Sequence, residues 1–468
     1  MPKRIVLRAL AAGSAALLAS AALPAAGALA DSGTAATAAA HYSGTLADGA
    51  QWIADVPPGT AWNGTVLLFS HGFGPTVAQD SPSDGVAQAL LARGYALAGS
   101  SYDPNGSWWA LNSAEHDQFA TLDAFDATVG AATGHRPSRV IAVGESMGGL
   151  VNAQLARDGG GRIDGALGLC GLVAGGVDLD EYQLDGEYAI ARLLDPAGGV
   201  KLVDFSSAAD AQATADRLAA LVTAAQQTPA GRARIALAAA YLNTADWAPG
   251  LNPPAAGDYP GQEAQQYDWL VTQGVLAFVE FGRYEVEQSA GGNTSWTTGV
   301  DFRRLLDSSV HLREVRGLYR AAGLDLDADL SALDSGPRVA ADPAAVARLR
   351  TSSTAGQSLA VPLLDLHTTA DQLVPVEQEN AFARRVARSG DGGLLRQAYV
   401  SRQSHCNFTT AEVVAGLEAV DSRVSTGRWG ASATAGALQT AAEAMGPAAG
   451  GAAFTDFRPP RLVGADAR

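Results

Sequence analysis

The sequence has little cysteine, little positive charge and few long apolar runs. Its 468 residues include two cysteines and two lysines, and charged residues make up only 17% of the chain. After residue 30, no apolar stretch is long enough to cross a membrane. Hydrophobic residues reach 47%, which excludes a disordered or collagen-like chain. The composition therefore predicts a globular protein with a large core.

Acidic side chains outnumber basic ones by 48 to 32, and the formal net charge is −16. A surface of this sign repels phosphate backbones and anionic lipid headgroups. We therefore expect no nucleic acid among the partners of this protein. The length permits two or three domains, or one enlarged α/β unit with an insertion.

Residues 1–30 have the layout of a secretory signal peptide. A basic start is followed by an apolar stretch rich in Ala and Leu and by an A-L-A tripeptide that ends at Ala30, and a signal peptidase accepts small residues there. Pro24 and Gly27 interrupt the apolar stretch, which favours a signal peptide over a transmembrane anchor. The sequence predicts a secreted protein that is cleaved near Ala30 and has no integral membrane association.

Strand and helix patterns alternate in the next part of the chain, after a hairpin pattern over residues 42–57. Apolar runs typical of strands buried on both faces are separated by helical segments. Asn112 and Glu115 have the spacing of a reciprocal cap at the start of the second helix. This order predicts a βαβ sheet with right-handed crossovers. The predicted strands cover 66–70, 95–101 and 140–143, and the predicted helices cover 83–93 and 112–129.

The third of these strands turns directly into a helix (150–157) through the sequence G-E-S-M-G-G at residues 144–149. A serine in this position, Ser146, lies on a tight strand-to-helix turn that exposes its hydroxyl at the carboxyl edge of the sheet. The amide of Met147 lies at a helix N-terminus, where free N–H groups stabilise a developing oxyanion. An ordinary turn serine is the alternative interpretation.

At this point the chain resembles the α/β-hydrolase superfamily, most closely its secreted bacterial serine esterases, lipases and peptidase-like members. The resemblance implies an α/β fold with a mostly parallel central sheet and a triad in the chain order Ser, acid, His. Asp371 lies in a loop after a predicted strand (361–367), and His405 follows the last predicted strand (395–400). These two residues therefore become the candidate acid and the candidate base.

The three residue types supply what acyl transfer requires. His405 is expected to take the proton of the Ser146 hydroxyl and later to protonate the leaving group, while Asp371 holds the imidazole in the useful tautomer. Asp365, inside the strand, and Glu377, in the following helix, are alternative acids. For His405, a surface histidine with a structural role is the alternative.

A second oxyanion donor is expected from the sequence H-G-F-G at residues 71–74, which follows the first buried strand. The resemblance implies that this segment shapes an oxyanion loop, in which the amide of Phe73 acts beside that of Met147. His71 is then a structural residue of the loop rather than a proton carrier.

Cys170 lies in a strand predicted over 163–172, and Cys406 directly follows His405. Parallel strands bring their carboxyl ends to one edge of the sheet, so the two sulfurs can meet beside the candidate site. Because an exported protein meets an oxidising compartment, we predict a disulfide between them. Two separate free thiols are the alternative.

The alternation stops between residues 173 and 358, where helical stretches replace it. We interpret 173–358 as a helical cap inserted into the hydrolase core, whose two parts cover 31–172 and 359–468. Most aromatic residues of this cap are expected to form its own core, whereas Trp108 and Trp109 could line an acyl pocket. In the Ala/Gly-rich C-terminal tail, disorder is expected from Pro459 onward. The clearest predicted cap helices cover 208–227, 232–243 and 310–322.

The sequence contains no P-loop, no dinucleotide-binding fingerprint and no H-E-x-x-H zinc helix. The acidic pattern D-x-D-x-D at 325–329 lacks the turn glycine and the closing glutamate of a calcium loop. We therefore predict no cofactor and no metal. The expected partner is a small-molecule or acyl-ester substrate.

The leading hypothesis is a secreted serine hydrolase that cleaves carboxylic esters through an acyl-enzyme intermediate. One alternative is a secreted aminopeptidase-like serine peptidase, with Glu280, Glu285 or Glu287 binding a substrate ammonium group. A second is an acyltransferase, which shares the acyl-enzyme step and differs in the acceptor. The third, a catalytically dead binding scaffold, belongs to a different class of protein.

Overall fold

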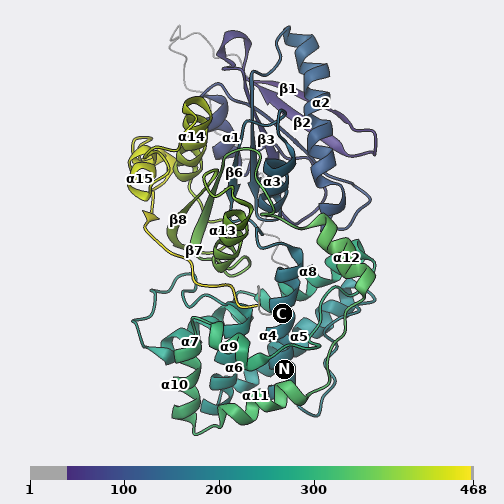
Figure 1. Ribbon diagram of the computed structural model, residues 1–468, viewed down its shortest axis with the longest axis vertical. Coiled ribbons are helices and arrows are strands. Elements are labelled where there is room, and N and C mark those ends of the chain that lie inside the picture. The colour runs from purple at the N-terminus through teal and green to yellow at the C-terminus, as the bar shows by residue number, and fades with distance from the viewer. Residues whose placement is uncertain (1–38, 465–468) are drawn as a thin grey trace, which may run out of the picture. The chain divides into compact units, whose positions relative to one another are not determined.

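A nine-stranded sheet forms the centre of the structure, a computed structural model that describes residues 39–464 (Figure 1). The predicted signal peptide lies outside these residues. Six neighbouring strands of the sheet, β4, β3, β5, β6, β7 and β8, are parallel, and β1, β2 and β9 add antiparallel strands at the two edges. The strands are β1 (Ala40–Thr45), β2 (Gln51–Val56), β3 (Thr65–Ser70), β4 (Ala96–Ser100), β5 (Arg139–Glu145), β6 (Gly165–Leu169), β7 (Leu363–Ala370), β8 (Leu395–Gln403) and β9 (Phe454–Thr455).

The central strands are apolar on both faces because helices cover both faces. On β3, Val66 and Leu68 belong to one hydrophobic cluster, while Leu67 and Phe69 belong to another, as the alternation of side chains along a strand requires. Helices α2, α3 and α13 pack on the first face, and α1, α14 and α15 pack on the second (Figure 1). These helices are α1 (Asp84–Leu91), α2 (Ala114–Thr133), α3 (Met147–Asp158), α13 (Glu377–Ser389), α14 (Thr410–Thr426) and α15 (Ala435–Glu443).

The segment between β6 and β7 is helical and builds a hydrophobic cluster of its own. We refer to residues 176–352 as the helical insertion. Trp269, Tyr241 and Phe302 are buried in its core. Its elements are α4 (Gly176–Leu194), α5 (Ala208–Ala225), α6 (Pro229–Leu242), α7 (Tyr259–Tyr267), the π-helical turn η3 (Asp268–Thr272), α8 (Val275–Ala290), α9 (Phe302–Ser308), α10 (Leu312–Ala322), α11 (Leu326–Ser335) and α12 (Pro343–Ser352).

The predicted cap at the start of α2 was wrong. The first residue before α2 is Ser113 rather than Asn112, and no side chain caps this helix end. The Asn112 amide instead donates to the hydroxyl and the backbone oxygen of Ser289, both at 3.0 Å. A long-range contact with α8 has therefore replaced the local cap.

The C-terminal segment also differs from the expectation, because residues 459–464 are packed and not disordered. Leu462 and Val463 are buried. Val463 donates its amide to the Asn243 side chain at 2.8 Å and accepts from the same side chain at 3.2 Å. The tail is thus bound to α6 of the insertion, far from it in sequence.

The predicted fold class is confirmed: the chain folds as an α/β structure around a mostly parallel sheet. Within residues 39–464, no helix has both the length and the apolar character needed to cross a membrane.

Candidate active site

Ser146 occupies the turn between β5 and α3, with φ 58° and ψ −121°. This is strained for a residue with a side chain, and such strain is typical of a nucleophile held at a strand-to-helix turn. The neighbouring glycines are required by close packing. A Cβ on Gly144 would collide with the backbone of Gly148, and a Cβ on Gly148 would collide with the backbone of Ser70.

His405 lies between Ser146 and Asp371 and contacts both. Its Nε2 is 2.8 Å from the Ser146 hydroxyl oxygen, and its Nδ1 is 2.7 Å from Asp371 Oδ2. Asp371 follows β7 directly, and His405 follows β8 by two residues. The ends of three parallel strands thus bring together residues that are 225 and 34 positions apart in the chain. These counts are the sequence separations 371 − 146 and 405 − 371. The structure holds the predicted Ser, Asp and His side chains in one hydrogen-bonded chain.

The charge of Asp371 is stabilised although its side chain is buried. Burial by itself would raise the pKa of Asp371, but the attraction of His405 and its hydrogen bond outweigh burial, and the pKa lies below its ordinary value. The other carboxylate oxygen accepts the backbone amides of Leu373 and Val374, each at 2.9 Å. Hydrogen bonds to the ionised form act in the same direction. The acid is therefore ionised and fixed in orientation.

The two alternative acids are in different environments. Asp365 is buried in β7, neither of its carboxylate oxygens has a hydrogen-bond partner among residues 39–464, and burial raises its pKa well above the ordinary value. Burial also raises the pKa of Glu377, to about 7. Of these three carboxylates, Asp371 is the one that hydrogen-bonds to His405.

The buried histidine His367 lies close to Asp371 and has no role predicted from the sequence. Its Nδ1 is 3.0 Å from Glu379 Oε1, and its Nε2 is 2.8 Å from the carbonyl oxygen of Val374 and 3.7 Å from Asp371 Oδ2. Burial would lower the pKa of His367, but Glu379 outweighs it and the pKa is raised. His367 and Glu379 thus support the loop that carries Asp371.

The H-G-F-G segment (residues 71–74) lies against the turn between β5 and α3 that carries Ser146. A Cβ on Gly72 would lie 3.1 Å from the Ser146 Cβ, so the backbone that leads into Phe73 passes beside the serine. His71 is buried and stacks on Tyr102 with ring centroids 4.0 Å apart. Burial lowers its pKa, which keeps the ring neutral and fits a structural role. Met147, the other predicted oxyanion donor, is the first residue of α3.

Cys170 and Cys406 form a disulfide, with Cα atoms 5.3 Å apart. Cys170 directly follows β6, and Cys406 Sγ lies 3.3 Å from His405 Nε2. The bond therefore ties the loop that carries His405 to the end of β6, which is separated from β8 by β7. Both cysteines have positive φ, 47° and 50°, so the two loops make sharp turns where they meet.

A cavity opens beside Ser146 and His405, and the helical insertion supplies much of its wall. Phe73 and Trp109 line it from the core, and residues of α4 and α8 line it from the insertion. Trp108 packs edge-on against Phe73 and against Phe281 of α8, with ring centroids 5.7 and 5.1 Å apart. Of the aromatic residues of α8, Phe278 lines the cavity, whereas Trp269 of η3 belongs to the core of the insertion.

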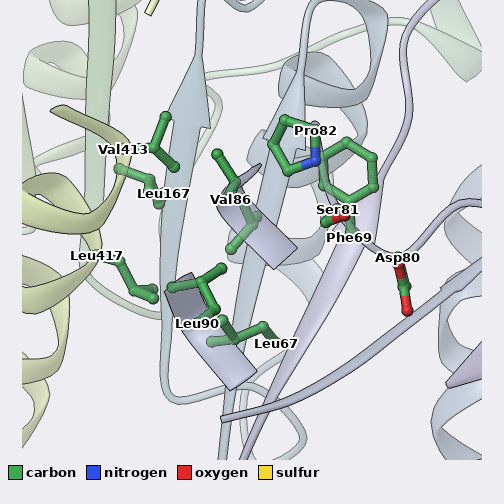
Figure 2. A pocket seen from close by; sticks show the side chains of 11 residues that line it. Leu67, Phe69, Asp80, Ser81, Pro82, Val86, Leu90, Leu167, Val413 and Leu417 are labelled. Atoms are coloured by element: carbon green, nitrogen blue, oxygen red, sulfur yellow. The ribbon is translucent and has the colours of Figure 1, made fainter. Parts of the chain in front are cut away.

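A different pocket lies between α1, α14 and the sheet (Figure 2). Its lining is mostly apolar, including Phe69, Val86 and Leu90, with the buried carboxyl of Asp80 at one side. Burial raises the pKa of Asp80 to about 6. None of the predicted catalytic residues lines this pocket.

Two of the three insertion carboxylates considered as ammonium ligands have hydrogen-bond partners within the protein. Glu285 accepts the amide of Trp108 at 2.9 Å, and Glu287 accepts the amides of Asp204 and Phe205 at 2.7 and 2.8 Å. Glu280 is fully buried, and burial together with Glu187 raises its pKa well above the ordinary value, which disfavours the charged form that would bind an ammonium group.

Among residues 39–464, two groups of side chains have the spacing of metal ligands. One is the pair of bonded cysteines with His405, and the other is Asp48 with His116 and Asp117 near the surface. In the first group the sulfurs are already joined to each other. The acidic pattern at 325–329 begins α11, where Asp325 accepts the amides of Asp327 and Ala328 as a helix cap.

The mostly parallel sheet and the arrangement of Ser146, His405 and Asp371 at its edge have the pattern that the resemblance to the α/β-hydrolase superfamily implied. The chain is 29% identical to the o-phthalyl amidase of Xanthobacter agilis over 415 residues, which cover 82% of this chain and 87% of the amidase. No protein-family model matches the chain.

Among solved structures, an esterase from Aspergillus oryzae is similar with a TM-score of 0.41 and 14% identity, covering 81% of this chain and 78% of the esterase. An acylaminoacyl peptidase has a TM-score of 0.36 and 11% identity. That similarity covers 78% of this chain and 37% of the peptidase chain.

Proposed function

We propose that this hydrolase is a secreted serine esterase that uses Ser146 as nucleophile, His405 as general base and acid, and Asp371 as the residue that orients His405. The observation that carries the proposal is the continuous hydrogen-bonded chain from Ser146 through His405 to Asp371, at 2.8 and 2.7 Å. A serine hydroxyl becomes an effective nucleophile when an adjacent base takes its proton.

In the proposed reaction, the Ser146 oxygen attacks the ester carbonyl carbon while His405 Nε2 accepts the hydroxyl proton. The carbonyl oxygen becomes an oxyanion, which the amides of Phe73 and Met147 stabilise. His405 then gives its proton to the departing alcohol, and an acyl-enzyme ester on Ser146 remains. Water attacks this ester with His405 again as base, which releases the acid and restores the serine.

Amide hydrolysis is the second candidate, because the curated relative with 29% identity is an amidase. The same residues serve both reactions, since only the leaving group differs. An amide requires more complete protonation of its nitrogen as the bond breaks, and His405 is the group that supplies this proton. Transfer of the acyl group to another alcohol would use the same acyl-enzyme ester.

We further propose that the segment 173–358 caps the site and that the mature protein is exported after cleavage near Ala30. The residues of α4 and α8 in the cavity wall support the cap. The disulfide beside the site is compatible with an oxidising compartment outside the cell.

The test compares p-nitrophenyl acyl esters of increasing chain length with aminoacyl p-nitroanilides, for the wild type and Ser146→Ala. We expect ester turnover that falls by several powers of ten in the variant, because loss of a triad nucleophile leaves only residual catalysis. Turnover of anilides alone would favour the peptidase. No turnover of either substrate would favour a binding scaffold, and full activity of Ser146→Ala would refute the proposed nucleophile.

A further inference from the structure

The wall of the active-site cavity contains an unusual polar group, Arg283 of α8. The residue is 1% exposed, and it lines the same cavity as Ser146 and His405. Burial would lower the pKa of Arg283, but Glu187 and Asp180 outweigh burial, and the pKa is raised. A permanent positive charge therefore lies in the wall of a cavity that is otherwise largely apolar.

The guanidinium is held by a nearly complete set of partners. Its Nη1 donates to Asp180 Oδ1 at 2.8 Å and to the Ser295 hydroxyl at 2.7 Å, and its Nη2 donates to Glu187 Oε2 at 2.6 Å. Its Nε, however, is buried and has no hydrogen-bond partner among residues 39–464. An unpaired buried donor costs about 1–3 kcal/mol, so this N–H favours any ligand atom that can accept from it.

Gln183 of α4 supplies a second unused polar group in the lining of this cavity. It lines the cavity, is 9% exposed, and its side chain makes none of the hydrogen bonds found in the described part of the chain. Gln183 lies three residues after Asp180, so the two side chains share one face of α4. The side-chain amide of Gln183 and the Nε of Arg283 are thus two hydrogen-bond donors that have no acceptor among the described residues.

The charges around Arg283 select the kind of acceptor. The guanidinium is already paired with the carboxylates of Asp180 and Glu187. A carboxylate on the ligand would bring a further negative charge into this group. A neutral oxygen, such as that of an ether or a ketone, can accept both hydrogen bonds without that repulsion.

We propose that Gln183 and Arg283 form a specificity subsite that binds a neutral oxygen acceptor on an otherwise apolar acyl group. The inference rests on the proposed esterase function. The leaving group has to depart and be replaced by water, whereas the acyl group stays bound to Ser146 until deacylation. A subsite made of two buried residues therefore suits the acyl group. The preferred substrates are therefore apolar acyl esters, such as benzoyl esters, that carry an ether or carbonyl oxygen.

The experiment compares p-nitrophenyl benzoates with a methoxy group at the ortho, meta or para position with the matching ethyl-substituted esters, which have nearly the same shape. We expect the wild type to prefer methoxy over ethyl in kcat/KM by about ten-fold at one ring position, the size of one hydrogen bond to a charged donor. The carboxy-substituted ester at that position is expected to be poorer than the methoxy ester.

Gln183→Leu is the main variant, because it removes a donor outside the ion pairs of Arg283. We expect its methoxy-to-ethyl ratio at that position to fall at least three-fold relative to the wild type. Comparing the two ratios cancels the electronic effect of the substituent. Gln212→Leu, an exposed glutamine of α5, is the matched control and should keep the wild-type ratio. Arg283→Lys, which keeps the charge and loses Nε, should lower the ratio as Gln183→Leu does.

A wild type that treats methoxy and ethyl esters alike at every position would overturn the subsite, as would an unchanged ratio in Gln183→Leu. A preference for the carboxylate would overturn the choice of a neutral acceptor. The ethyl esters test the esterase function separately. If they are cleaved by the wild type and not by Ser146→Ala, the proposed function stands whatever the ratios show.

Discussion

The candidate triad and the interior of the helical insertion both contain buried charges, but they stabilise them differently. Asp371 has partners for both carboxylate oxygens, and its pKa lies below the ordinary value although burial acts to raise it. In the insertion, four acidic side chains surround Arg283. Burial raises the pKa of Glu187 and of Glu287 to about 7. The site is built for an ionised acid, whereas the insertion is stable with some of its acids protonated.

The two regions stabilise their buried charges differently because the hydrogen-bond and ion-pair partners come from different parts of the chain. At the sheet edge, a short loop supplies backbone amides to Asp371, and a neighbouring loop supplies His405. In the insertion, the groups come from separate helices, and one cation serves several acids. Buried ion pairs add little stability over an apolar core, but removing one member is costly because a buried charge is left alone. The two regions should therefore respond differently to mutation and to pH.

The largest expected effect on stability is that of Arg283→Met. The variant leaves Asp180 and Glu187 without their cation, and we expect the free energy of unfolding to fall by about 3–5 kcal/mol. Urea unfolding followed by circular dichroism measures the loss. The matched control is Arg217→Met, which breaks an ion pair of a half-exposed arginine with Asp195 and should cost no more than about 1 kcal/mol. Equal losses in the two variants would remove the contrast between buried and exposed pairs.

A smaller, pH-dependent effect is expected from Glu280→Gln. The pKa of Glu280 is raised in the folded state by burial and by Glu187, so its contribution to stability is full below the ordinary value of 4.5 and is lost as pH rises toward the folded-state pKa. Glutamine does not ionise. Above about pH 5, the free energy of unfolding of the variant should therefore increase relative to that of the wild type, by up to about 1.4 kcal/mol per pH unit.

Urea unfolding at about pH 5 and about pH 8 checks this sign. Asp371→Asn provides the opposite case, because the pKa of Asp371 is lowered in the folded state. The stability that Asp371 contributes is present above the ordinary value of 3.8 and is lost as pH falls. If the pH dependences of Glu280→Gln and the wild type run parallel, Glu280 is not protonated in the folded protein.

The smallest losses of stability are expected from removing a helix cap, and each of the two regions contains one cap that can be compared. Thr409 and Glu412 form a capping box at the start of α14, next to the loop of His405. Thr228 caps α6 of the insertion by accepting the amide of Gly231 at 2.9 Å. We expect Thr409→Ala and Thr228→Ala to lose about 1 kcal/mol each. Only Thr409→Ala should also lower kcat for ester hydrolysis, and equal kcat values would show that this cap does not position the histidine loop.

The sheet and the elbow could be predicted because their signals are local. Apolar runs bounded by turn residues marked β3, β4 and β5, and the glycines around Ser146 marked a turn that only small residues permit. The position of Asp371 in a loop favoured it over Asp365. The insertion offered only helical composition, so its helices could be anticipated but their partners could not.

The features that were predicted wrongly or not predicted from the sequence all depend on contacts between distant segments of the chain. Asn112 has the right chemistry for a helix cap, but its amide bonds to Ser289 across 177 positions. The tail after Pro459 looked unstructured, yet Val463 bonds to Asn243 from 220 positions away. Likewise, the position of His367 behind Asp371 and the crowding of acids around Arg283 depend on contacts between separate segments. Sequence patterns carry information about neighbours in the chain and little about such pairs.

The sequence by itself determined the fold class, the elbow with its serine, and the order of the candidate acid and base, because strand burial, tight turns and chain order leave marks on consecutive residues. Only the tertiary structure decided the hydrogen bonds from Ser146 to Asp371, the joining of Cys170 to Cys406, and the unpaired donor of Arg283 in the cavity. These features depend on distances between distant segments, and those distances are fixed by the packing of the whole core.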